Sequence, residues 1–373
     1  MARILMLGAF GQRNVGDEAL CASLCDAFCD HDLIVASTDP TLTTALHGCA
    51  AVPARPLDVA REVRHADVVL VGGGTVLKTL HPSAGRRPHA LLINTAGLVT
   101  LARWSSTPVA FVGVGADQLR GGTAQRWARR IARDASLLVL RDEESAAVLT
   151  DAGVTPPFWI GGDIAWRLFR AGRPDRHRRV DGRPRATVAL SHLAGGPSND
   201  LPERLGAALA ELAADGWELA LQPWQAGPRD LEVADRIRRL APSARLVEMP
   251  TDLVAAAHHF ADDDLVVAMR FHALVAAGAA GTRSVAIAHE PKLAGLARRL
   301  DQIAVAPDAS VPILASALRW GADHRAPSDQ AVRHEIELAD HSLRLAALLV
   351  EGGRLDHPEH LPALELSDGG GRW

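Results

Sequence analysis

The feature that most constrains the fold is a regular alternation of short apolar segments with longer segments of helical periodicity. In the first half of the chain the apolar segments are residues 4–7, 33–36, 67–71, 109–112 and 137–140. Segments with helical periodicity lie between them, at residues 18–28, 91–104 and 123–134. Such an alternation predicts βαβ units, in which helices connect parallel strands. We therefore expect an α/β fold built on a parallel sheet.

The alternation stops at residues 170–185, which we interpret as a linker. Between its first and last arginines this segment holds five further arginines, two glycines and two prolines, and little that could enter a core. The alternation then resumes with apolar segments at residues 186–190, 218–221, 265–269 and 284–288. A length of 373 residues suits two domains of ordinary size. We predict two Rossmann-like parallel-sheet domains that face a cleft, at residues 1–175 and 184–328, then a helix at 329–351 and a flexible tail at 352–373.

Charge and hydropathy exclude several classes of protein. The formal net charge is −4 and the isoelectric point is near 6.5, which argues against nucleic-acid binding, because such proteins present a basic surface. No apolar run approaches the ~20 residues that span a bilayer. The N-terminus enters a predicted strand directly and lacks the features of a signal peptide. We expect a soluble, cytoplasmic protein with no transmembrane segment, and leave open whether it forms a homo-oligomer.

The four cysteines are interpreted as structural residues. Cys21, Cys25 and Cys29 follow helical spacing, and Cys49 is the only other thiol. Buried thiols on one helix face act as small apolar side chains. No Cys-x-x-Cys pair or matching histidine cluster accompanies them, so we predict no metal site. A disulfide framework does not suit a cytosolic chain.

Arg270 and His272 are the residues most indicative of function. They follow the apolar segment 265–269 and precede an alanine-rich helical segment. In open parallel sheets ligands bind outside the carboxyl ends of strands, where two donors at this spacing can grip an anion together. The alternative is that both side chains only cap the helix and bond nearby carbonyls. Lys292 favours the anion site, because it follows the segment 284–288 and only Lys78 is also a lysine among 40 basic residues.

Loops at the predicted strand ends of the first half are further candidates. They are Asn14-Val15-Gly16-Asp17-Glu18, Gly72-Gly73-Gly74-Thr75, Gly113-Val114-Gly115 and Arg141-Asp142-Glu143-Glu144-Ser145. Their glycines allow a backbone to approach a ligand closely, but their spacing does not match the dinucleotide fingerprint, so we expect no NAD. The alternatives are that the acidic residues only favour a helix N-terminus, that the glycines only form tight turns, and that the Arg141 segment is a surface network.

In their order and position these segments resemble the polysaccharide pyruvyl transferase family. The resemblance rests on the loops above, on Asp163, and on the block from Met269-Arg270-Phe271-His272 to Lys292, and it covers about residues 1 to 300. It implies a GT-B-like pair of Rossmann-type domains. It also implies transfer of the pyruvyl group of phosphoenolpyruvate onto hydroxyls of a sugar or glycan acceptor as a ketal, with release of phosphate.

The resemblance also implies roles for individual residues. Arg270 and His272 would bind phosphoenolpyruvate, with Lys292 as a further phosphate ligand. The chemistry needs an acid and a base, for which we assign His272, as general acid or phosphate-side donor, and Asp17, as base or ligand of the acceptor hydroxyl. No metal or cofactor is expected. The full set of predicted substrate-binding residues is Arg270, Lys292, His192, Asn14, Glu18, Gly73, Gly74 and Arg141.

The chain departs from the family pattern at three positions. Ile164 replaces a usual proline, His289 an aromatic residue and His192 an arginine. Imidazole is not reliably charged at pH 7, so the anion site would be weaker at His192.

Two other functions share the predicted architecture. A GT-B glycosyltransferase that uses a nucleotide sugar would have the same cleft and a cationic diphosphate site. A two-lobed ligand-binding protein would keep the cleft without catalysis. For the transferase we expect phosphoenolpyruvate on the C-terminal domain and the acceptor on the N-terminal domain.

Overall fold

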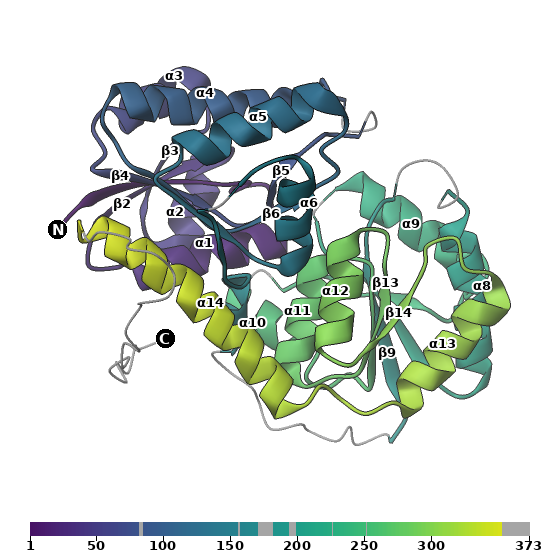
Figure 1. Cartoon of the computed structure of the whole chain (residues 1–373). Helices are drawn as coiled ribbons and strands as arrows, with labels where there is room; N and C mark the ends of the chain where they lie inside the picture. Colours follow the sequence, from purple (N-terminus) through teal and green to yellow (C-terminus); the bar gives the residue numbers. More distant parts are fainter. Residues whose placement is uncertain are drawn as a thin grey trace.

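Two parallel β-sheets, each covered by helices on both faces, make up the protein (Figure 1). The computed structural model describes residues 1–81, 85–155, 157–170, 182–193, 199–225, 227–250 and 252–352, with the side chains of residues 254 and 257 excepted. The predicted fold class of two parallel-sheet α/β domains is confirmed. Most of the predicted linker and nearly all of the predicted tail lie outside the described residues, so the domain limits stay predictions.

The first sheet has eight strands in the order β3-β2-β1-β4-β6-β7-β8, with β5 paired to β6. Its strands are β1 (Arg3–Leu7), β2 (Asp32–Ser37), β3 (Ala50–Pro53), β4 (Val68–Gly72), β5 (Thr75–Lys78), β6 (Val109–Asp117), β7 (Leu137–Leu140) and β8 (Trp159–Ile160). The helices that connect them are α1 (Val15–Ala27), α2 (Pro40–His47), α3 (Pro56–Val63), α4 (Ala90–Trp104), α5 (Gly121–Asp134), α6 (Glu143–Asp151) and α7 (Ala165–Arg170).

Alternate side chains of these strands enter two separate cores. Leu5 and Val69, which are paired in register, face the core formed with α4 and α5. Ile4 and Leu70 face the opposite core, formed with α1 and α7. Because successive side chains point to opposite faces of a strand, a strand that is apolar throughout must be covered on both sides. Figure 1 shows α3, α4 and α5 on one face and α1 on the other.

The second sheet has six strands in the order β11-β10-β9-β12-β13-β14. They are β9 (Arg185–Leu190), β10 (Glu218–Pro223), β11 (Arg245–Leu246), β12 (Leu265–Ala268), β13 (Ser284–Ile287) and β14 (Ile303–Val305). The helices are α8 (Leu201–Ala214), α9 (Pro228–Arg238), α10 (Leu253–His258), α11 (Phe271–Ala280), α12 (Pro291–Arg299) and α13 (Val311–Asp323). In each sheet the reversal of strand order places β1 beside β4, and β9 beside β12, where parallel sheets bind ligands.

The last described helix, α14 (Asp329–Val350), leaves the second domain and packs on the first. Figure 1 shows α14 running from the second domain to the first, where it contacts β6, β7 and α7. The Ser342 hydroxyl donates to the Gly162 carbonyl and accepts from the Gly162 amide, each at 2.9 Å. A Cβ at Gly162 would lie 2.5 Å from the backbone nitrogen of Ala339, so only glycine permits this approach. The helix predicted as a separate element therefore completes the N-terminal domain.

Contacts between the domains also involve α6 and α12. Arg299 of α12 pairs with Glu144 of α6, at 3.1 Å, and with Glu335 of α14, at 2.6 Å. Glu144 belongs to the Arg141 segment, so this part of the segment is an interdomain ion pair. Within the described part of the chain, no helix combines the length and the apolar character needed to cross a membrane.

Candidate functional site

A cavity of about 1220 Å³ lies between the two domains, at the carboxyl ends of strands from both sheets. It exceeds the ~300–1,000 Å³ of an ordinary ligand site, so it has room for two substrates. Glu18 is the one predicted site residue that does not line it. The nine that do are Asn14, Asp17, Gly73, Gly74, Arg141, His192, Arg270, His272 and Lys292.

Arg270 is held rigidly at the start of α11. Its Nε donates to the Leu190 carbonyl at 2.8 Å, and its Nη2 contacts both carboxylate oxygens of Asp230, at 2.9 and 3.0 Å. The alternative interpretation, a side chain that bonds a nearby carbonyl, is thus partly realised. Nη1, however, makes no hydrogen bond to any described residue, and a guanidinium carries five N–H donors. Arg270 can therefore present a fixed pair of donors to the cavity.

Asp230, in the first turn of α9, organises this side of the cavity and was not predicted. It is 2% exposed and accepts hydrogen bonds from the backbone amides of His192, at 3.2 Å, and of Trp224 and Gln225, both at 3.3 Å. The sequence signal was only that of an acidic residue soon after a proline, which is typical of any helix start. Its partners lie on other strand ends, so only the fold shows its importance.

His272 sits against Gly16 and Asp163 of the first domain. A Cβ at Gly16 would lie 2.0 Å from His272 Nδ1, so glycine is required at that position. His272 Nε2 lies 3.4 Å from Asp163 Oδ2, within ion-pair range but without a hydrogen bond. Burial alone would raise the pKa of Asp163, but His272 and then Arg141 outweigh it, and the pKa lies below its usual range. Asp163 is therefore an anion beside the imidazole.

Arg141 and Lys292 come from different domains and meet at Thr75. Arg141 Nη2 and Lys292 Nζ both donate to the Thr75 hydroxyl, at 3.1 and 3.2 Å. The Arg141 guanidinium also lies over the Phe271 ring, 4.4 Å from its centroid, which is a cation–π contact. A Cβ at Gly115 would lie 2.6 Å from Arg141 Nη2, which explains that glycine.

Lys292 is paired to Glu290, a partner that the sequence analysis did not single out. Burial, and then the positive charge of Arg141, lower the pKa of Lys292, while Glu290 opposes them. Burial would raise the pKa of Glu290, but Lys292 lowers it to about 2. Burial also lowers the pKa of His289, which lines the cavity beside them, so its imidazole is neutral at pH 7.

Asp17 is the carboxylate on which the cations converge. Burial raises its pKa to about 6, with a contribution from Glu18, while His272, Arg270 and Lys292 oppose the rise. Arg270, Lys292 and the imidazole of His272 therefore all act on one carboxyl group. Asp17 makes no side-chain hydrogen bond within the described ranges, which leaves its oxygens available in the cavity. A group with such a pKa can accept or donate a proton near neutral pH.

The loop that leads into α1, and so to Asp17 in the first turn of that helix, contacts the second domain. The Asn14 side chain accepts from the Gly16 amide at 3.1 Å and caps α1, and the Asn14 backbone forms an antiparallel bridge with Gln225. The neighbouring Gly73 and Gly74 have left-handed φ values of 61° and 69°. They form the turn between β4 and β5, and they line the cavity with backbone atoms, since glycine has no side chain.

Glu18 points away from the cavity, contrary to its predicted role in substrate binding. Its side chain is buried, and both carboxylate oxygens are occupied. Oε1 accepts from the Gly11 amide at 2.9 Å, and Oε2 lies 3.0 Å from His47 Nε2. Helical periodicity explains the difference, because consecutive helix residues point in directions about 100° apart. Asp17 therefore faces the cavity and Glu18 the interior of the domain.

Two Rossmann-like domains whose strand ends enclose a cationic cavity define a GT-B-like protein, and solved structures share this fold. UDP-GlcNAc 2-epimerase from Neisseria meningitidis, bound to UDP-GlcNAc, is similar with a TM-score of 0.64 and 11% identity, over 94% of this chain and 100% of that chain. HepE from Anabaena, with UDP and glucose, gives a TM-score of 0.62 at 15% identity, over 94% and 100%. MnaA from S. aureus, with UDP, gives 0.62 at 12%, over 94% and 97%.

The family follows from the sequence itself. The family model for polysaccharide pyruvyl transferase matches residues 14–291, well over half of the chain, and this protein belongs to that family. The match includes every cavity-lining residue predicted above except Lys292, which lies just beyond its end. No curated protein matches the chain. Family membership supports a transferase that modifies a polysaccharide, with a sugar or glycan as acceptor.

Proposed function

We propose that this protein transfers the pyruvyl group of phosphoenolpyruvate onto two hydroxyls of a sugar or glycan as a ketal, with release of phosphate. The observation that carries the proposal is that Arg270, His272, Lys292 and Asp17 line one cavity in a member of this family. A donor with a phosphate and a carboxylate needs a multiply cationic site, whereas the proton transfers need a titratable group near neutral pH.

The donor is proposed to lie on the side of the second domain. The free Nη1 of Arg270 and the side chain of Lys292 supply charge-assisted donors for its anionic groups. Arg141 adds charge from the first domain, and the backbone around His192 is fixed by Asp230. Because Arg270 and Lys292 are already held by Asp230 and Thr75, little reorganisation accompanies binding.

Proton transfer is assigned to His272 and Asp17. His272 gives a proton to the methylene carbon of the donor, which leaves an oxocarbenium-like carbon. An acceptor hydroxyl attacks that carbon and loses its proton to Asp17. The carbon–oxygen bond to phosphate breaks, and the phosphate takes the proton from Asp17 as it leaves. A second hydroxyl then closes the ketal and gives its proton to the imidazole of His272. Asp163 Oδ2 lies 3.4 Å from His272 Nε2 and orients the imidazole for this step.

The acceptor is proposed to occupy the part of the cavity in the first domain. Beyond Asp17 this part is lined by α3 and α4, with Asn94 among apolar residues such as Val59 and Leu98. Lys78, Arg86 and Arg120 of the first domain also line the cavity, so positive charge is present on both sides. A cytoplasmic location stays a prediction.

The test is to incubate the purified protein with phosphoenolpyruvate and a panel of glycan acceptors and to measure phosphate release. Product analysis should show a ketal joined to two acceptor oxygens. Parallel reactions with nucleotide sugars test the second candidate, a GT-B glycosyltransferase, which several structurally similar proteins suggest because they were solved with UDP or UDP-sugars. Nucleoside diphosphate release without phosphate release from phosphoenolpyruvate would reject our proposal. Binding of either donor without turnover by any acceptor would indicate a binding protein.

A further inference from the structure

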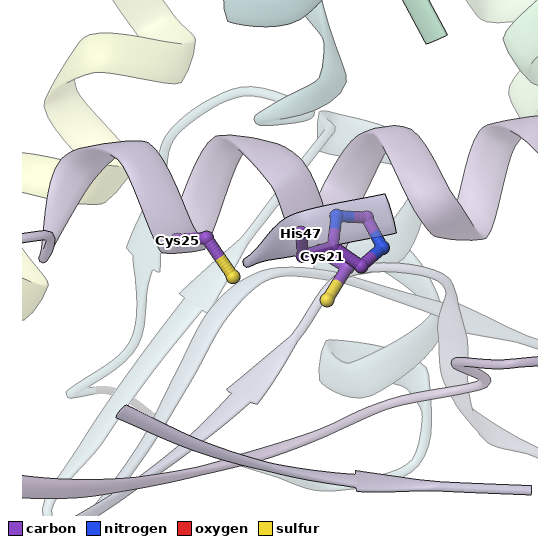
Figure 2. A group of neighbouring side chains, drawn as sticks. All are labelled: Cys21, Cys25 and His47. Carbon is purple, nitrogen blue, oxygen red and sulfur yellow. The ribbon is translucent and has the colours of Figure 1, made fainter. Parts of the chain in front are cut away.

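A cluster of thiols and one imidazole lies between α1 and α2, away from the cavity. Cys21 and Cys25 are one helical turn apart on α1, and His47 is the last residue of α2. Their sulfur atoms and a ring nitrogen of His47 all lie within 4.8 Å of one another. Figure 2 shows the two sulfurs on the same side of α1, turned toward each other, with the imidazole beside Cys21.

A third thiol joins the cluster from the next segment. Cys49 Sγ lies 3.6 Å from Cys25 Sγ. Gly48, between His47 and Cys49, has a left-handed φ of 67°, which turns the chain sharply at the end of α2. The spacing Cys-x-x-x-Cys and His-x-Cys therefore brings Cys21, Cys25 and His47 together, with Cys49 next to Cys25 as a fourth soft ligand at the edge of the group.

One ring nitrogen of His47 has no partner. The side chain is 1% exposed, and its Nε2 lies 3.0 Å from Glu18 Oε2, whereas the buried Nδ1 makes no hydrogen bond within the described part of the chain. A carboxylate at Nε2 favours the tautomer that carries its proton there, and Nδ1 then keeps a free lone pair. Buried polar atoms are normally satisfied, so an unpaired Nδ1 beside two thiols is a candidate ligand atom.

We propose that Cys21, Cys25, His47 and Cys49 bind a thiophilic divalent cation, Zn²⁺ being the best match to this ligand set. Sulfur and imidazole ligands in a closed tetrahedral arrangement are typical of structural zinc. Zn–S bonds of ~2.3 Å place tetrahedral sulfurs about 3.8 Å apart, close to the separation of Cys25 and Cys49. Binding displaces each thiol proton to solvent and requires no oxidant or reductant.

The cation would be connected to the cavity through Glu18. Metal-bound histidines usually donate their other N–H to a carboxylate, which fixes the ring. Here that carboxylate is Glu18, and its second oxygen accepts from the Gly11 amide in the loop between β1 and α1. The same loop continues through Asn14 into the cavity. A bound cation would thus anchor the loop that positions Asp17, and Glu18, which does not reach the cavity, gains a function.

The first test is a titration of the full chain, purified with reductant and then stripped with a chelator. We expect one equivalent of Co²⁺ to produce a sulfur-to-cobalt charge-transfer band with the visible bands of tetrahedral cobalt. One equivalent of Zn²⁺ should abolish both and raise the melting temperature, on the order of 5 °C at saturating metal. The absence of a charge-transfer band would overturn the proposal. So would a stoichiometric Cys25–Cys49 disulfide, found by mass spectrometry, that persists during purification with reductant.

Matched variants localise the site. Cys25→Ser should weaken the charge-transfer band and remove the thermal shift, whereas Cys29→Ser, an exposed thiol outside the cluster, should match the parent protein. Glu18→Gln should weaken Zn²⁺ binding about 10–100-fold, because it loosens the coordinating imidazole. Equal effects of Cys25→Ser and Cys29→Ser would reject this site. If Cys25→Ser does not fold, the cobalt spectrum of the unmodified chain still decides the question.

Discussion

Truncating Arg270 to alanine separates donor binding from the integrity of the fold. The substitution removes the bond to the Leu190 carbonyl and the contacts of Nη2 with both carboxylate oxygens of Asp230, and it leaves Asp230 buried without its counter-charge. Breaking a buried ion pair usually costs about 3–5 kcal/mol of stability. Asp230 keeps three backbone amide donors, so we expect a loss near the lower limit, about 3 kcal/mol.

The substitution should also weaken the binding of phosphoenolpyruvate, and this effect is separate from the loss of stability. If the free edge of Arg270 grips an anionic group of phosphoenolpyruvate, its loss should cost about 2–5 kcal/mol of binding. At ~1.4 kcal/mol for each factor of ten, this raises the dissociation constant about 30- to 4,000-fold. Calorimetry with phosphoenolpyruvate measures binding, and denaturant unfolding measures stability.

The control is Arg319→Ala. Arg319 also pairs with two carboxylates, Glu211 and Asp215, but on the surface and outside the cavity. Exposed pairs contribute at most about 1 kcal/mol, so this variant should keep both stability and donor affinity. Unchanged phosphoenolpyruvate binding by folded Arg270→Ala would refute the assignment of the donor site.

Three further predictions concern the groups around Asp17. His272→Ala should lower turnover about 10²–10⁴-fold with a smaller effect on donor binding; near-normal steady-state rates would leave the imidazole a purely structural role. Asp17→Asn should bind phosphoenolpyruvate but lose turnover. In the parent protein kcat/KM should fall as the pH drops through about 6, because a protonated carboxyl cannot act as the base. The same pH profile in Asp17→Asn would contradict this assignment. Gly16→Ala should displace His272 and abolish turnover, whereas Gly122→Ala, where a Cβ meets no atom within 4 Å, should be silent in the same assay; equal activities would show that the close approach does not matter.

The architecture could be predicted because it depends on local patterns. Buried parallel strands are apolar on both faces, so segments such as β4 and β12 stand out in the sequence, and the switch-point rule locates ligand sites at their ends. The crossing of α14 to the first domain could not be predicted this way. It depends on Gly162 meeting Ala339 and Ser342, a contact between residues about 180 positions apart.

The partners of the site residues were also hidden from the sequence. Asp230 and Thr75 act on Arg270, Arg141 and Lys292 through contacts between separate strand ends, which periodicity cannot show. The cysteines were interpreted as apolar side chains because the sequence has no Cys-x-x-Cys pair, the spacing typical of metal ligands. The fold places His47 and Cys49 beside them.

The return of α14 to the first domain affects how the chain can be made and folded. A domain completed by a helix near residue 340 cannot close its core when only its own strands have been synthesised. During synthesis, the surface of β6, β7 and α7 that α14 covers stays exposed until the whole second domain and then α14 have emerged from the ribosome. Exposed apolar surface of this kind is what makes folding intermediates prone to aggregate. We expect the isolated fragment that ends before α14 to need chaperones, and folding of the first domain to be the last event rather than the first.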